Sequence, residues 1–81
     1  MVDIRVADSL WDSTIFPEGQ LKRWRADDGA DVKAGDVLAE IRIGEATHEI
    51  VAPIAGRLAR VASSRDIIEP GSLLARLAPR D

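Results

Sequence analysis

The sequence predicts an all-β domain, and three observations support this class. Short runs of alternating apolar residues are separated by Gly, Pro, Asp and Ser, a pattern that is typical of strands joined by turns. No stretch has the 3.6-residue apolar period of an amphipathic helix. Two of the alternating runs, residues 38–43 and 46–51, are separated by Gly44 and Glu45 alone, which indicates a tight β-hairpin.

The central hairpin predicts the register of its two strands. Glycine at the first position of a two-residue loop suits a type II′ turn, because that position needs a positive φ. The turn sets three pairs opposite each other, Ile43 and Ala46, Ile41 and His48, and Ala39 and Ile50. These six residues should share the core face. The other face should carry Leu38, Glu40, Arg42, Thr47, Glu49 and Val51. We expect an exposed tip at residues 43–46 and no helix within residues 38–51.

The other elements follow in order along the chain. Alternation predicts a first strand over residues 2–6, and turn formers predict a loop over residues 7–18. Further strands are expected over residues 19–25, 56–61 and 73–77, with residues 78–81 frayed. Turn signals separate them at residues 27–29, 33–36 and 69–72. Pro53 ends the hairpin ladder, because proline offers no N–H to a neighbouring strand.

A weak internal repeat indicates two similar halves. Residues of the segment 19–41 recur 36 or 37 positions later in the segment 56–77. The matched pairs are Gly19 and Gly56, Leu21 and Leu58, Trp24 and Val61, Gly35 and Gly71, Leu38 and Leu74, Ala39 and Ala75, and Ile41 and Leu77. Two strand–turn–strand units predict two quasi-equivalent sheets packed face to face. Residues 1–81 are therefore expected to form a single domain.

The composition argues against several classes of function. The chain has no cysteine and one histidine, so neither a disulfide framework nor a metal site is expected. The net charge is −3, and the dispersed arginines lack interleaved aromatics, which argues against nucleic-acid binding. No run approaches the roughly 20 apolar residues of a membrane span, and the N-terminus lacks a secretory signal pattern. The default expectation is a cytoplasmic protein that is a monomer on its own.

The spacing of these residues resembles the biotinyl/lipoyl domain family. The pattern G-x-L-x-x-W-x-x-x-D-G-x-x-V-x-x-G-D-x-L-A-E-I begins at Gly19, and A-T-x-E-I-x-A-P-x-x-G-x-L begins at Ala46. The resemblance covers about residues 2–77 and is closer to the lipoyl branch. It implies a flattened barrel-sandwich hybrid of two four-stranded antiparallel sheets with a pseudo-twofold axis. In active members the hairpin presents a lysine, and the amide-linked prosthetic group swings between active sites of a multienzyme complex.

The chain departs from the family pattern at the attachment position. The lipoyl pattern E-T-D-K-A falls on residues 42–46, so Glu45 takes the lysine position, Gly44 the aspartate and Arg42 the glutamate. The biotinyl pattern M-K-M falls on residues 44–46 and also finds no lysine. A carboxylate cannot supply the amine that attachment requires. No cofactor is therefore expected on the tip, which consists of Ile43, Gly44, Glu45 and Ala46.

Three functions from different classes follow from the resemblance. The first is a docking or assembly module that associates with a larger subunit of a 2-oxo-acid dehydrogenase, acetoin dehydrogenase or carboxylase system. The second is a true acyl or carboxyl carrier that is modified at Lys22 or Lys33, the only lysines. The third is an enzyme, which the sequence argues against because it contains no Ser/His/Asp or Cys/His set.

The candidate docking residues each have a structural alternative. In the family, the loop after the first strand lies near the tip and helps partners to recognise the domain. Leu10 and Trp11, together with Phe16, would then form an exposed docking site, or they would fold back over the open edge of the barrel.

The polar residues of the hairpin have alternatives of the same kind. Arg42 is either a docking residue or a cross-strand partner of Glu49 that offsets the like-charge pair of Glu40 and Glu49. Glu45 is either a recognition residue or a solvated turn residue. His48 is expected to be partly buried at the edge of the apolar face.

Overall fold

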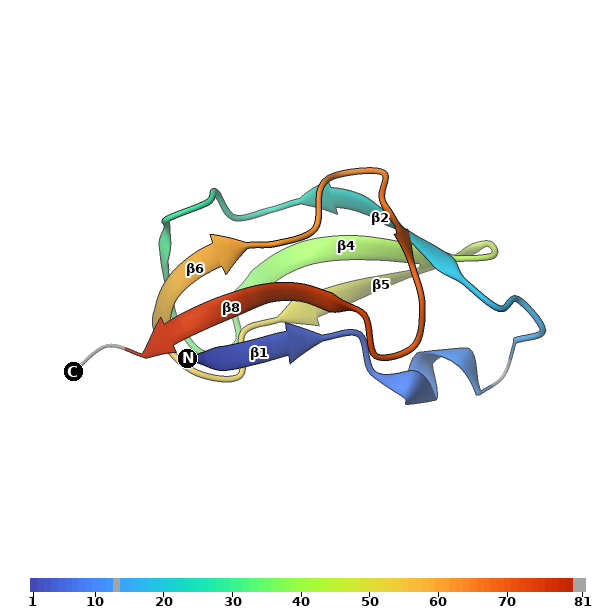
Figure 1. Ribbon diagram of the computed structural model, residues 1–81, viewed down its shortest axis with the longest axis horizontal. Coiled ribbons are helices and arrows are strands. Elements are labelled where there is room, and N and C mark those ends of the chain that lie inside the picture. Colours follow the sequence, from blue (N-terminus) through green and yellow to red (C-terminus); the bar gives the residue numbers. More distant parts are fainter. Residues whose placement is uncertain (13, 80–81) are drawn as a thin grey trace.

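The fold of this protein consists of two four-stranded antiparallel sheets (Figure 1). The computed structural model describes residues 1–12 and 14–79. The strands are β1 (Val2–Arg5), β2 (Gly19–Trp24), β3 (Asp31–Val32), β4 (Val37–Ile43), β5 (Ala46–Val51), β6 (Gly56–Arg60), β7 (Ile67–Ile68) and β8 (Leu73–Pro79). A 3₁₀ turn, η1 (Asp8–Trp11), follows β1. The predicted all-β class is confirmed.

The two sheets are related by the expected pseudo-twofold axis. The first sheet has the order β1-β8-β6-β3, and the second has the order β5-β4-β2-β7. The strands β1, β2, β3 and β4 therefore occupy the same places in their sheets as β5, β6, β7 and β8 occupy in the other sheet. Two equivalent turns carry glycines with positive φ, 90° at Gly35 and 85° at Gly71. The repeat in the sequence thus reflects two structurally equivalent halves.

The core lies between the two sheets in two adjoining clusters. One cluster contains Val6, Trp11, Leu21, Ala39, Ile41, Ile43, Ile68 and Leu74. The other contains Ile4, Val32, Leu38, Ala52, Leu58, Ala75 and Leu77. Trp24 and Ile50 pack against both clusters. The Trp24 indole N–H donates to the Ala62 carbonyl at 3.0 Å, so the polar atom of this ring is satisfied at the edge of the core.

The predicted hairpin register is confirmed, but the expected environments of Leu38 and Ala46 are wrong, since Ala46, expected on the core face, is exposed beside the turn. Ile43 pairs with Ala46, Ile41 with His48 and Ala39 with Ile50. Leu38, which was expected on the outer face, is fully buried. A bulge between Val37 and Ala39 turns its side chain inward. The Leu38 carbonyl then accepts bonds from the N–H groups of both Arg25 and Ala26, at 2.8 and 3.2 Å.

Several boundaries and short elements differ from the sequence-based expectation. The two-residue strands β3 and β7 and the turn η1 were not predicted, because such short elements show no periodicity. Strand β8 continues through Pro79 instead of ending at Leu77. The expected fraying of residues 78–79 is therefore wrong, and residues 80–81 lie outside the described range. None of the helices in the described ranges has the length and apolar character needed to cross a membrane.

Candidate functional site at the hairpin tip

The tip of the β4–β5 hairpin lies at the end of the molecule opposite the start of β1 and the end of β8 (Figure 1). Gly44 has a φ of 61°. Among described non-glycine residues only Arg65 has a positive φ, so Glu45 has the negative φ that a type II′ turn requires. The side chain of Ile43 is buried in the core, whereas Glu45 and Ala46 are exposed. The tip is therefore anchored on one strand and open to solvent on the other.

Arg42 stabilises the turn and does not pair with Glu49. Its Nε donates to the carbonyl oxygen of Gly44 at 2.8 Å. The side chain is exposed, so the rest of the guanidinium group is accessible from solvent. The predicted cross-strand partnership with Glu49 is absent from the described ion pairs. The docking role of Arg42 stays a prediction.

Phe16 lies directly against the tip. A Cβ placed on Gly44 would lie 2.6 Å from Cε2 of the Phe16 ring, so only glycine fits at this position with the ring in place. The Phe16 N–H donates to Oγ1 of Thr14 at 3.2 Å. The Phe16 side chain is half exposed, and Ile15 beside it is 97% exposed. This short segment therefore presents an apolar surface next to the turn.

Trp11 is part of the core and is not an exposed docking residue. Its side chain is buried within the cluster that contains Val6 and Leu74, and Leu10 packs against the same cluster. The exposed-docking alternative is therefore wrong for Trp11, and the fold-back alternative holds. The cause is the 3₁₀ turn, which directs the indole into the core. Its Nε1 atom has no hydrogen-bond partner among the described residues.

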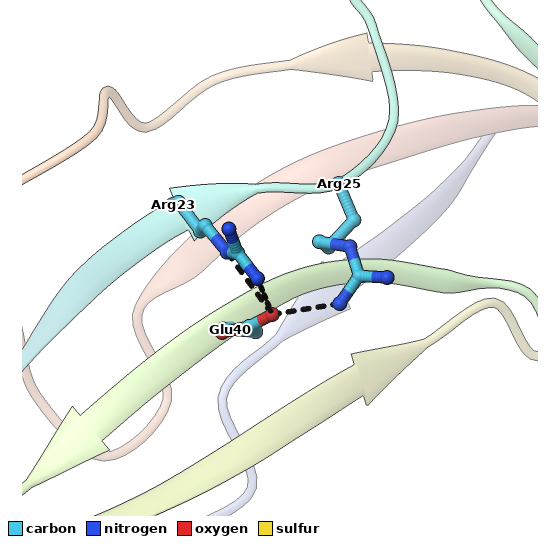
Figure 2. Close-up of polar contacts among 3 residues, drawn as sticks. All are labelled: Arg23, Arg25 and Glu40. Carbon is cyan, nitrogen blue, oxygen red and sulfur yellow. Dashed lines mark hydrogen bonds and ion pairs between the residues drawn. The ribbon is translucent and has the colours of Figure 1, made fainter.

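A cluster of three charged residues lies on the outer face of the second sheet and was not predicted. Nε and Nη2 of Arg23 donate to Oε2 of Glu40 at 3.1 and 3.0 Å, and Nη1 of Arg25 donates to the same oxygen at 2.8 Å (Figure 2). The Glu40 side chain is only 10% exposed. The two guanidinium groups hold the pKa of the Glu40 carboxyl below its ordinary value of 4.5, chiefly through the hydrogen bond from Arg23 and then that from Arg25.

The like-charge pair of Glu40 and Glu49 is thus compensated by Arg23 of β2 and by Arg25 just after this strand, and not by Arg42. The pairing of Arg23 with Glu40 follows a register shift between Leu21 and Arg23. That shift is a tertiary feature, so the sequence carried no signal for this cluster beyond the presence of the charges.

We expect Glu40→Gln to alter how the stability of the domain depends on pH. The pKa of Glu40 is lower in the folded state than in the unfolded state, so its ionised carboxylate stabilises the fold fully at any pH above the unfolded-state pKa. This stabilisation is lost as the pH falls through the folded-state pKa. Glu40→Gln should therefore be less stable than the wild type at neutral pH. The difference should shrink as the pH falls below about 4.5. Urea unfolding over a pH series measures this, and a difference that does not change with pH would contradict it.

His48 lies at the partly buried position that was expected. It is on the core-side face of the edge strand β5 and lines a hollow of about 300 Å³ beside the tip. Leu10, Phe16 and Glu45 line the same hollow. Within residues 1–12 and 14–79, no group of three His, Cys, Asp or Glu side chains is arranged to hold a metal ion.

Comparison with known proteins assigns this fold and its hairpin to a family. The family model described as "Biotin-requiring enzyme" (Biotin_lipoyl) matches residues 13–77. The chain belongs to the biotinyl/lipoyl attachment domain family. It is also 35% identical over 68 residues to the dihydrolipoyllysine-residue acetyltransferase component of pyruvate dehydrogenase complex from Rhizobium meliloti (strain 1021). That match covers 82% of this chain but only 15% of the relative.

The two lysines of this biotinyl/lipoyl domain lie away from the hairpin tip. Lys33 precedes the turn that enters β4 at Val37, so it lies at the end of β4 opposite the tip. Lys22 is exposed within β2, at the register shift between Leu21 and Arg23. Neither lysine is part of a two-residue hairpin turn.

Proposed function

We propose that this domain is an unmodified docking or assembly module of a multienzyme complex and carries no prosthetic group. The observation that supports this proposal is the combination of an intact hairpin with a carboxylate at its tip. The type II′ turn, the Arg42 bond to Gly44 and the buried Ile43 anchor are all present. Glu45 occupies the position at which we expect carrier domains of the family to hold lysine, and a carboxylate is not an amine nucleophile.

The partner that we propose is a 2-oxo-acid dehydrogenase complex. The relative from Rhizobium meliloti is a component of pyruvate dehydrogenase complex, which favours this class over an acetoin dehydrogenase or a carboxylase. The match spans 15% of that relative's length, so the similarity concerns one domain and not the acetyltransferase activity. We propose no catalytic activity for this domain itself.

The docking surface that we propose is the tip with the segment beside it. Phe16 and Ile15 supply exposed apolar area, and Arg42 supplies an exposed cation on the other side of the turn. Apolar anchors flanked by a charged rim are typical of binding hot spots. This arrangement differs from the predicted one, because Phe16 and Ile15 take the place that was expected for Trp11.

The first test is the intact mass of the full chain expressed in cells supplied with both lipoate and biotin. We expect the unmodified mass, because Lys22 and Lys33 do not lie at a hairpin tip. A mass increase equal to one lipoyl or biotinyl group would overturn the proposal. Peptide mapping would then identify Lys22 or Lys33 as the modified residue of a true carrier.

The second test measures binding to purified pyruvate dehydrogenase complex from the organism that encodes the chain. We expect Phe16→Ala to weaken binding by about tenfold, because truncation of an aromatic anchor costs more than 1 kcal/mol. Lys33→Gln is the matched control, since this exposed residue lies at the far end of the domain. Equal binding by both variants would contradict the proposed surface, and no binding by the wild type would contradict the proposed partner.

A further inference from the structure

The edge of β5 differs from the other sheet edges of the described chain. Strands β3 and β7 have two residues each, and β1 has four, one of which is the basic residue Arg5. Strand β5 has six residues, and none of them is Pro, Lys or Arg. The bulge in its pairing lies on β4 and not on β5. Proteins usually protect sheet edges with short strands, bulges, prolines or basic side chains, and β5 has none of these.

The hairpin register determines which backbone groups of β5 face outward. In a two-residue hairpin the residues that flank the turn form a hydrogen-bonded pair, and such pairs alternate along the ladder. Ala46, His48 and Ile50 therefore bond to β4. The N–H and C=O groups of Thr47, Glu49 and Val51 point away from it. The rest of the described chain offers these three backbone positions no hydrogen-bond partner.

A groove runs along this edge. A hollow of about 310 Å³ lies between β1 and β5 and is lined in part by Ile4, Ile50 and Val51. The hollow beside the tip, of about 300 Å³, shares Leu10 with it. Most of the surface inside the first hollow is apolar, and Asp3, Arg5 and Glu49 also line it. Side chains on the inner face of an added strand would have apolar neighbours over most of its length.

The outer side of the same edge is acidic. Glu49 lies at the middle of β5 and Glu45 lies just before its start. Neither forms an ion pair with a residue in the described ranges. A strand added beside β5 would place every second side chain on the outer face, with one of them directly opposite Glu49 and its neighbours on that face diagonal to it. Basic side chains at those positions would complement the charge.

We propose that the edge of β5 binds an extended peptide segment in which basic and apolar side chains alternate, and that this segment joins the second sheet as a fifth strand. Main-chain hydrogen bonds to Thr47, Glu49 and Val51 hold it, as in other cases of strand addition. Its basic side chains lie beside Glu49, and its apolar side chains enter the groove. A second copy of this chain is a poorer occupant, because it brings further Glu45 and Glu49 carboxylates to the same edge.

The test titrates the peptide acetyl-Lys-Val-Lys-Val-Lys-Val-amide into the full, ¹⁵N-labelled chain and follows amide hydrogen exchange. We expect slower exchange at the amides of Thr47, Glu49 and Val51, and unchanged exchange at Ala46, His48 and Ile50, which already bond to β4. The peptide in which Glu replaces Lys should bind at least fivefold more weakly. Changes in amide exchange that are confined to residues 43–46, or equal binding of both peptides, would overturn the proposal.

Variants of β5 separate the backbone contribution from the charge. Thr47→Pro removes one outward N–H and no bond to β4, and it should weaken peptide binding about tenfold. Thr47→Val keeps the N–H and should bind as the wild type does. Glu49→Gln should weaken binding by up to about fivefold. If Thr47→Pro does not fold, the exchange pattern of the wild type still decides the outcome.

Two further experiments distinguish peptide binding at this edge from self-association and from docking at the hairpin tip. Sedimentation velocity tests for self-association, and a concentration-dependent dimer that Thr47→Pro abolishes would assign the edge to a second copy and overturn the peptide proposal. The tip variant Ile15→Ala, at an exposed residue that lines neither hollow, should keep the Thr47, Glu49 and Val51 exchange pattern with the peptide. Failure of docking at the tip would therefore leave the result for this edge unaffected.

Discussion

The triple variant Arg42→Glu, Gly44→Asp and Glu45→Lys is expected to gain one lipoyl group when it is expressed with lipoate and a lipoate ligase. Glu45→Lys alone is expected to gain little. The single substitution supplies the amine, but the Arg42 guanidinium group remains bonded to the Gly44 carbonyl at 2.8 Å. A cation then lies beside the new ammonium group, and like charges so close together disfavour the native tip geometry. Intact mass measures the modified fraction directly.

The position of the Phe16 ring also affects how much of the triple variant is lipoylated. Asp at position 44 places a Cβ 2.6 Å from the Phe16 ring, so the half-exposed ring must move away. The first central position of a type II′ turn favours glycine, so the turn must also change to accept the aspartate. We therefore expect Phe16→Ala to raise the modified fraction of the triple variant further.

The control for this experiment is Glu49→Lys. It adds an exposed amine on β5 outside the turn and should stay unmodified. Efficient modification of Glu45→Lys alone would show that only the amine is missing from this tip. An unmodified quadruple variant, with Phe16→Ala included, would contradict the assignment of position 45 as the attachment position.

Gly56→Ala is expected to cost about 3 kcal/mol of unfolding free energy, the upper end of the usual range for overpacking. The new Cβ would lie 2.5 Å from the carbonyl oxygen and 3.1 Å from the carbonyl carbon of Ala78. Both atoms are backbone, so β6 and β8 would have to separate in the middle of the first sheet. A domain of this size has a total stability of only about 4–12 kcal/mol. Urea unfolding measures the loss.

Gly19→Ala is the matched control, because Gly19 is the pseudo-twofold equivalent of Gly56. Its Cβ would lie 2.8 Å from the Arg42 carbonyl oxygen and 2.9 Å from Cγ1 of Ile43. One of the two close atoms belongs to a side chain that can shift, so we expect a smaller loss than for Gly56→Ala. A Gly56→Ala variant as stable as the wild type would show that β6 and β8 do not approach so closely.

The features that the sequence predicted correctly depend on local geometry. The register of the hairpin follows from the alternation of side chains about Gly44, since a strand has a period of two and the turn permits one alignment. The two equivalent sheets follow from the recurrence of Gly19 and Gly35 at Gly56 and Gly71. The family resemblance rests on the same positions, and the match over residues 13–77 confirms it.

The candidate site was predicted less completely. The position of the tip and the exposure of Glu45 followed from the turn alone. Phe16 was considered only as a companion of Trp11, yet it is Phe16 that contacts Gly44 and Trp11 that is buried. A loop of twelve residues carries no periodicity that separates an inward aromatic side chain from an outward one, because only the surrounding core decides which ring is enclosed.

The sequence by itself determined the all-β class, the hairpin and the carboxylate at its tip, because each is set by residues close together in the chain. It also determined the twofold repeat, because the same local pattern occurs twice along the chain. Only the tertiary structure decided the inward turn of Leu38, the enclosure of Trp11 and the charge cluster of Glu40 with Arg23 and Arg25. These features depend on bulges and on contacts between strands that are far apart in sequence. Their free energies come from packing and desolvation, which no local pattern of residues specifies.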